Sequence, residues 1–126
     1  MVVDDEPSAR GLLRRVNSHF GFETIEARDG EEGWELYVQD KPDLTISDIY
    51  MPKMNGLQLL SKIKKDDENA KVILITGFSH FRLLLQTNSH LRPDGFLEKP
   101  FDIEDLGRVM KKFLNDMNPT PKLSDD

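Results

Sequence analysis

Residues 72–76 read Val-Ile-Leu-Ile-Thr, an apolar run that ends in a hydroxyl residue. Residues 44–48 read Leu-Thr-Ile-Ser-Asp, a second largely apolar run that ends in a carboxylate. Runs of this kind, which lack a strict alternation of apolar and polar residues, are typical of strands that helices cover on both faces. The two stretches therefore predict the centre of a parallel sheet.

Helical and strand patterns alternate on both sides of these two stretches. The expected strands are 2–3, 22–27, 44–47, 72–75 and 95–98, and the expected helices are 7–20, 31–39, 57–65, 81–86 and 103–117. Pro7 suits a first helical turn, and Gly21 suits the position just past a helix end. Strands that alternate with helices in this way predict an α/β domain with a mostly parallel sheet.

The composition restricts the class of protein. The chain has 126 residues, which suits one domain with a substantial core. Its net charge is −6, which argues against a basic surface for nucleic acid, and it has no cysteine for a disulfide or a thiolate metal site. Its apolar runs are much shorter than the roughly 20 residues that cross a bilayer. We expect a cytoplasmic domain over residues 1–117, followed by a flexible tail or the start of a linker at 118–126.

Residues with useful chemistry follow four of the expected strands. They are Asp4 and Asp5 after the first strand, Asp48 after the third, Thr76 after the fourth and Lys99 after the fifth. Ligands of parallel α/β sheets bind beyond the carboxyl ends of the strands, so these side chains should meet there. Three carboxylates in one place repel one another unless a cation joins them, and Mg²⁺ prefers carboxylate and phosphate oxygens. A carboxylate can also attack phosphorus, and a lysine suits a phosphoryl oxygen. The sequence therefore predicts a site for a divalent cation and a phosphoryl group.

The same four segments resemble the receiver domain of response regulators in two-component signalling. They are Val-Val-Asp-Asp-Glu-Pro at 2–7, Ser-Asp-Ile-Tyr-Met-Pro-Lys-Met-Asn-Gly at 47–56, Ile-Thr-Gly at 75–77 and Leu-Glu-Lys-Pro-Phe at 97–101. The resemblance extends from residue 1 to about residue 117. It implies a flavodoxin-like (βα)5 fold, which is a doubly wound parallel five-stranded sheet with strand order 2-1-3-4-5.

The resemblance also implies a role for each site residue. Asp48 would accept the phosphoryl group. Asp4 and Asp5 would hold Mg²⁺ together with Asp48 and the backbone carbonyl of Tyr50. The domain would take its phosphoryl group from a phosphohistidine on a sensor histidine kinase or a histidine phosphotransfer protein, and it would not be a turnover enzyme.

Three further features follow from the resemblance. Thr76 and Lys99 would contact the phosphoryl group, and the Lys99–Pro100 bond would be cis. Phe96 would be the switch aromatic, which turns inward when Thr76 moves to the phosphate. A homodimer would form through the fourth helix, the last strand and the last helix. Residues 78–93, which include the expected fourth helix, depart from the sequence pattern of the family.

The acids, Thr76, Phe96 and Lys99 each have an ordinary interpretation too. Asp4 and Asp5 suit a helix N-terminus, and Asp48 suits a turn. Thr76 suits a buried strand, Phe96 suits a core, and Lys99 suits a solvated loop. We expect Trp34 and Tyr37 to pack between helices, and we expect exposed side chains at His19, His80, His90, Lys62, Lys64 and Lys65.

Two other functions compete with the receiver interpretation. One is a Mg²⁺-dependent phosphohydrolase with an aspartyl-phosphate intermediate, but such enzymes often carry a second acid where this chain has Tyr50. The other is an interaction module that works without phosphorylation, which the intact set of acids, threonine and lysine argues against.

Overall fold

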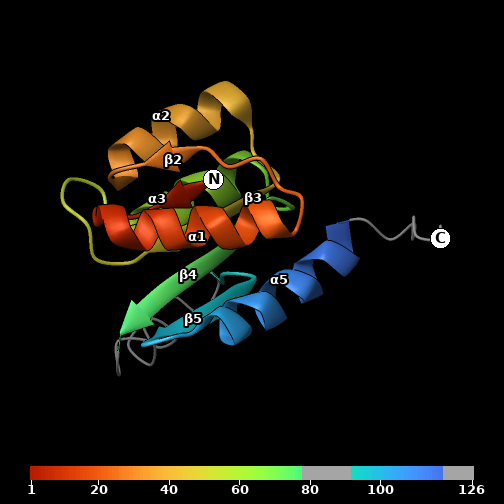
Figure 1. The fold of residues 1–126 in the computed structure, drawn as a ribbon. Coiled ribbons are helices and arrows are strands. Elements are labelled where there is room, and N and C mark those ends of the chain that lie inside the picture. The colour runs from red at the N-terminus through yellow and green to blue at the C-terminus, as the bar shows by residue number, and fades with distance from the viewer. Residues whose placement is uncertain (78–91, 118–126) are drawn as a thin grey trace.

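The computed structural model describes residues 1–77 and 92–117, with side chains up to Phe113. The elements are β1 (Val2–Val3), α1 (Pro7–His19), β2 (Glu26–Ala27), α2 (Gly30–Asp40), β3 (Leu44–Asp48), α3 (Gly56–Asp66), β4 (Lys71–Gly77), β5 (Gly95–Lys99) and α5 (Ile103–Met117) (Figure 1). The helix expected at 81–86 lies outside the described residues. All the other expected elements are present, and all their bounds but one agree with the predictions to within two residues.

The five strands form one parallel sheet with the order β2-β1-β3-β4-β5. This confirms the flavodoxin-like strand order that the resemblance implies. The register places Val3 beside Ser47, Asp48 beside Ile75, and Gly77 beside Lys99. The carboxyl ends of β1, β3, β4 and β5 therefore meet at one edge of the sheet.

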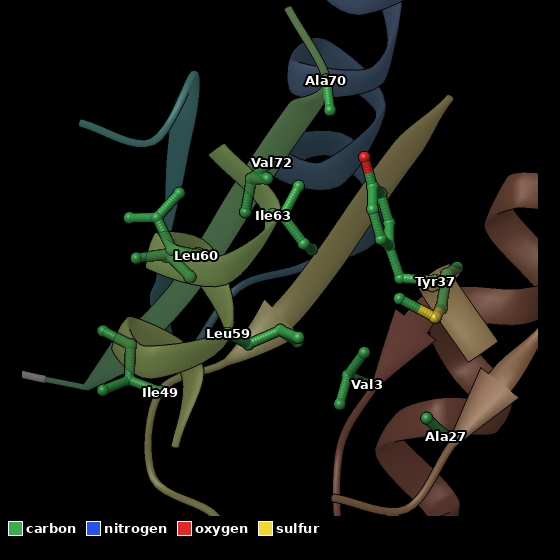
Figure 2. Close-up of a cluster of buried hydrophobic side chains, with 11 residues drawn as sticks. Val3, Ala27, Tyr37, Ile49, Leu59, Leu60, Ile63, Ala70 and Val72 are labelled. Atoms are coloured by element: carbon green, nitrogen blue, oxygen red, sulfur yellow. The ribbon is translucent and has the colours of Figure 1, made fainter. Parts of the chain in front are cut away.

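Helices cover both faces of this sheet, as the apolar runs predict. The face toward α2 and α3 carries Val3, Val72 and Leu74, and Figure 2 shows Leu59 and Ile63 of α3 gathered with Val3 and Val72. The face toward α1 and α5 carries the alternate residues of the strands, among them Val2, Ile46, Ile73 and Ile75. Full burial of one such side chain contributes roughly 1.5–3 kcal/mol, so the two layers hold the strand ends in fixed positions.

Local sequence signals set the helix ends. The Asp29 side chain accepts a hydrogen bond of 2.8 Å from the Glu32 amide at the start of α2. Asn55 and Gln58 exchange reciprocal hydrogen bonds at the start of α3, which is a capping box. Gly21 has φ +87°, in the left-handed region that glycine reaches most easily, and this confirms its predicted place after α1.

Two expectations were wrong. The second strand covers Glu26–Ala27 rather than 22–27, because the Phe22 amide donates to the carbonyl of Asn17 and so closes the end of α1.

Lys64 is not part of a solvated face, since its side chain is 16% exposed and its ammonium lies 2.8 Å from Asp94. The same ammonium donates to the Ala70 carbonyl at 2.7 Å, and it thereby ties the end of α3 to the turn before β4. Lys62 and Lys65 are exposed, as expected.

Candidate functional site

Three carboxylates gather at the sheet edge where β1 and β3 end. Each of Asp4, Asp5 and Asp48 offers an oxygen within 4.8 Å of the oxygens of the other two. Asp4 and Asp48 are buried, whereas Asp5 is exposed to solvent. Buried carboxylates at this separation carry a large electrostatic penalty unless protons or cations offset their charge.

Asp4 shows this penalty most clearly. Its Oδ1 accepts a 3.0 Å hydrogen bond from the Glu6 amide, whereas Oδ2 is buried and has no hydrogen-bond partner among the described residues. Burial raises the pKa of Asp4, and the charges of Asp48 and Asp5 raise it further, against the Glu6 hydrogen bond and the Lys99 charge, which lower it. An unpartnered buried oxygen beside two other carboxylates fits a hard divalent cation such as Mg²⁺.

Asp48 is held from both sides of its carboxylate. Its Oδ1 accepts a 2.8 Å hydrogen bond from the Ile49 amide, and its Oδ2 lies 3.1 Å from Lys99 Nζ. Burial lowers the pKa of Lys99, but the hydrogen bond and charge of Asp48, together with the charges of Asp4 and Glu6, produce a net increase. Lys99 is therefore a stable ammonium group beside the acids.

The loop after Asp48 packs closely against it. Gly56 donates from its amide to the Ile49 carbonyl at 2.8 Å. A Cβ atom at residue 56 would lie 2.3 Å from the Asp48 carbonyl oxygen, so a larger residue has no room. This close approach is a physical reason for the glycine of the 47–56 segment.

Thr76 ends β4 at the same sheet edge. It is buried, and its hydroxyl lies 3.5 Å from the Gly77 carbonyl oxygen, which is a long hydrogen bond. Among the described residues, none comes within 4 Å of a Cβ atom built at Gly77. Thr76 thus has a hydroxyl that can turn toward a ligand at small energetic cost.

The remaining expected residues lie around this edge. Tyr50 follows Asp48 in the loop, and its side chain is 58% exposed. Phe96 is partly buried against the core on the α2 and α3 face. The Lys99–Pro100 bond is cis, as expected.

Comparison with known proteins decides the family. A family model described as the response regulator receiver domain matches residues 1–111. The chain belongs to this family. Receiver domains are signalling modules that accept a phosphoryl group, rather than turnover enzymes, and the acid cluster described above is typical of the family's metal site.

Individual relatives agree with this assignment. The receiver domain is 32% identical over 114 residues to sporulation initiation phosphotransferase F of Bacillus subtilis, covering 90% of this chain and 91% of the relative. It is 34% identical to the chemotaxis protein CheY of Thermotoga maritima, covering 88% of this chain and 96% of the relative. Among solved structures, the REC domain of AraT from Geobacillus stearothermophilus matches with a TM-score of 0.82 and 31% identity, covering 94% of this chain and 93% of that one. The chain spans about half the length of several other curated relatives.

The receiver domain is expected to have a kinase or phosphotransferase as its partner. In the part of the chain that the structure describes, no helix is both long and apolar enough to cross a membrane. A groove between α1 and α5, lined by Leu12, Phe20 and Ile103 among others, lies apart from the acids.

The structure brings the three acids and Lys99 together, as the sequence predicts. Sequence reasoning missed Arg10, whose Nη1 donates a 2.9 Å hydrogen bond to the Asp4 carbonyl. Arg10 lies one helical turn beyond Glu6, and its amide donates to the Glu6 carbonyl at 3.1 Å. Its position on α1 was the only signal in the sequence, and position alone does not show that the side chain reaches back to β1.

Proposed function

We propose that Asp48 is the phosphoryl acceptor of this receiver domain, and that a phosphohistidine on a sensor histidine kinase or a histidine phosphotransfer protein is the donor. The observation that carries the proposal is the position of Asp48, beside Asp4 and Asp5 and in contact with Lys99 at 3.1 Å. The chemistry needs a carboxylate oxygen at the sheet edge, and Lys99 places a positive charge in contact with that oxygen.

In the proposed reaction, a carboxylate oxygen of Asp48 forms a bond to phosphorus. The bond from phosphorus to the imidazole nitrogen breaks, its electron pair stays on the ring, and the ring takes up one proton to leave as neutral imidazole. Negative charge spreads over the phosphoryl oxygens during this transfer, so positioning and opposite charge provide most of the catalysis.

Asp4, Asp5 and Asp48, with the backbone carbonyl of Tyr50, would hold Mg²⁺. When bound, Mg²⁺ supplies positive charge that offsets the repulsion of the carboxylates and the charge of the phosphoryl oxygens. The buried Asp4 Oδ2 without a partner supports this part of the proposal, as does the donor set of hard oxygens.

Lys99 and Thr76 would bind two oxygens of the phosphoryl group. Lys99 is already at the acceptor carboxylate, and its side chain is 39% exposed, so it can move from Asp48 to a phosphoryl oxygen. The long hydrogen bond of Thr76 supports a similar movement of the hydroxyl.

The resulting change would bias an equilibrium between two conformations. Thr76 would move to the phosphoryl group, and Phe96 would turn further inward from its partly buried position. The last helix, α5, would report the change to a partner. A homodimer through the fourth helix, β5 and α5 belongs to the same proposal, but the fourth helix lies outside the described residues.

We also propose a cytoplasmic location and a domain boundary near residue 117, with residues 118–126 as a tail or the start of a linker. These residues lie outside the part that the structure describes.

Chemical trapping tests the acceptor directly. The protein is incubated with Mg²⁺ and phosphoramidate, a small donor with the same phosphorus–nitrogen bond as phosphohistidine, and then reduced with borohydride. Reduction converts an aspartyl phosphate to homoserine, which peptide sequencing by mass spectrometry locates. We expect homoserine at position 48. Homoserine at position 4 or 5, or none in a folded and Mg²⁺-loaded sample, would contradict the proposal.

A further inference from the structure

Arg10 reaches from α1 back to the end of β1. Its side chain is 15% exposed, although it is an arginine near the start of a surface helix. Nη1 donates to the Asp4 carbonyl at 2.9 Å, and Nε lies 3.3 Å from the Glu26 carboxylate on β2. Arg10 therefore joins three elements at the point where the metal-binding acids begin.

These contacts complete a set that holds Asp4. The Asp4 amide donates to the Ala27 carbonyl at 3.1 Å, its Oδ1 accepts from Glu6, and its carbonyl accepts from Arg10. Only Oδ2 lacks a partner within the described residues. The carbonyl of Asp4 and the amide of Asp5 belong to one rigid peptide plane. A hydrogen bond to that carbonyl therefore restrains the backbone between the two acids.

The positive charge of Arg10 acts against Mg²⁺ binding, whereas its hydrogen bond to Asp4 should favour it. A guanidinium near a site for a divalent cation disfavours the cation by Coulomb repulsion. Glu26 offsets part of this charge, because it pairs with Arg10 and also with Arg14 at 3.0 Å. Loss of Arg10 should therefore strengthen Mg²⁺ binding if its charge matters most, and weaken it if its hydrogen bond matters most.

We propose that Arg10 is a positioning residue for the metal-binding acids, and that its hydrogen bond to the Asp4 carbonyl outweighs the repulsion from its charge. This inference rests on the proposed function, because it takes Asp4, Asp5 and Asp48 as the Mg²⁺ ligands. Residues that orient metal ligands through hydrogen bonds typically change metal affinity by roughly 10–100-fold when they are removed.

The test compares Arg10→Met with Arg14→Met. Both substitutions remove a guanidinium from the same helix and a partner from the same Glu26, but the contact to the Asp4 carbonyl belongs to Arg10. Isothermal titration calorimetry with Mg²⁺ alone gives the dissociation constant of each variant. We expect Arg10→Met to bind about tenfold more weakly than the wild type, and Arg14→Met to stay within about twofold. Binding by Arg10→Met that is unchanged or tighter would overturn the inference.

A second measurement needs no metal. Amide hydrogen exchange in EDTA at Asp4 and Glu6 reports how firmly this segment is held. We expect several-fold faster exchange in Arg10→Met and no change in Arg14→Met, whereas equal exchange in the two variants would refute the positioning role. If Arg10→Met does not fold, Arg10→Lys takes its place. We expect Arg10→Lys to bind Mg²⁺ more weakly than the wild type and Arg14→Met, but without losing binding altogether.

The two proposals fail in different ways. If the wild type binds no Mg²⁺, or if Asp4→Asn leaves its binding unchanged, the proposed metal site is wrong, and the exchange measurement still decides whether Arg10 holds the segment. If the wild type binds Mg²⁺ and loses it in Asp4→Asn, but Arg10→Met binds normally, only the inference about Arg10 is wrong.

Discussion

Lys99 Nζ lies 3.1 Å from Asp48 Oδ2, so the end of β5 contacts the end of β3 across β4. The two residues are 51 positions apart in the chain. The contact places an ammonium on an oxygen of the carboxylate that we propose as the phosphoryl acceptor. Lys99 therefore pairs with the carboxylate before the reaction and is close enough to bind a phosphoryl oxygen after it.

Lys99→Ala should slow phosphorylation by acetyl phosphate by roughly 10–100-fold, because removal of a group that stabilises transition-state charge has effects of this order or larger. Lys99→Arg should retain part of the rate, because it keeps the positive charge but replaces a compact ammonium with a planar guanidinium. Initial rates at saturating Mg²⁺ check this, with the exposed Lys62→Ala as the control. Equal rates for Lys99→Ala and the control would show that Lys99 acts only in the resting protein.

Asp4→Asn should stabilise the protein in EDTA at neutral pH by about 1 kcal/mol, because it removes a buried charge whose Oδ2 has no partner in the described structure. The same substitution should remove the increase in stability that Mg²⁺ gives the wild type. Urea unfolding with and without Mg²⁺ measures both effects. A less stable variant in EDTA would mean that the acid cluster is not strained.

The effect of Asp4→Asn should also depend on pH. Burial, and then the charges of Asp48 and Asp5, raise the pKa of Asp4 in the folded protein. Between its ordinary value of about 3.9 and this raised value, the folded state binds the proton more tightly than the unfolded state. The stability of the fold therefore falls as pH rises from the ordinary pKa to the raised pKa, and the ionised Asp4 destabilises the fold in full above the raised pKa. The advantage of the asparagine variant should shrink as pH falls through the folded pKa, and should be lost below the ordinary value.

Gly56→Ala and Gly11→Ala form a matched pair. A Cβ atom at residue 56 would lie 2.3 Å from the Asp48 carbonyl oxygen, whereas one at residue 11 would meet no described residue within 4 Å. Gly56→Ala should therefore destabilise the fold by roughly 1–3 kcal/mol and slow phosphorylation, because the end of β3 must shift. Gly11→Ala should stabilise α1 by about 0.5–1 kcal/mol without slowing phosphorylation. Thermal unfolding and phosphorylation rates check both variants, and similar results for the two would argue against close packing at Asp48.

Lys53→Asn should stabilise the protein by about 0.5–1 kcal/mol. Lys53 has φ +70°, a left-handed conformation that is costly for most residues and easier for asparagine. Its ion pairs with Asp29 at 4.0 Å and Glu31 at 3.8 Å are long, and the Lys53 side chain is 62% exposed, so their loss has little effect. Chemical denaturation measures the change, and a destabilised variant would show that these ion pairs outweigh the backbone strain.

The sequence predicted most of this fold because its signals are local. Apolar runs mark β3 and β4, proline marks the start of α1, and glycine marks its end. The acid cluster was also predictable, because the residue that follows each strand must lie at the same sheet edge once the strands are parallel.

Contacts between distant side chains were not predictable in the same way. The pair of Lys64 with Asp94 and the hydrogen bond of Arg10 to Asp4 depend on how helices pack over strand ends, which periodicity does not specify. The short β2 depends on Phe22, whose residue type favours a strand although its amide bonds to the end of α1 instead. The positive φ of Lys53 had no signal, because lysine rarely adopts it.

The central claim is a Mg²⁺-dependent phosphorylation of Asp48, and the mass of the intact protein tests it most directly. The wild type and Asp48→Asn are incubated with acetyl phosphate, each with Mg²⁺ and with EDTA. We predict one added phosphoryl group on the wild type with Mg²⁺, and none in the other three samples. An adduct of the same amount on Asp48→Asn, or no adduct on a folded wild type with Mg²⁺, would contradict the account.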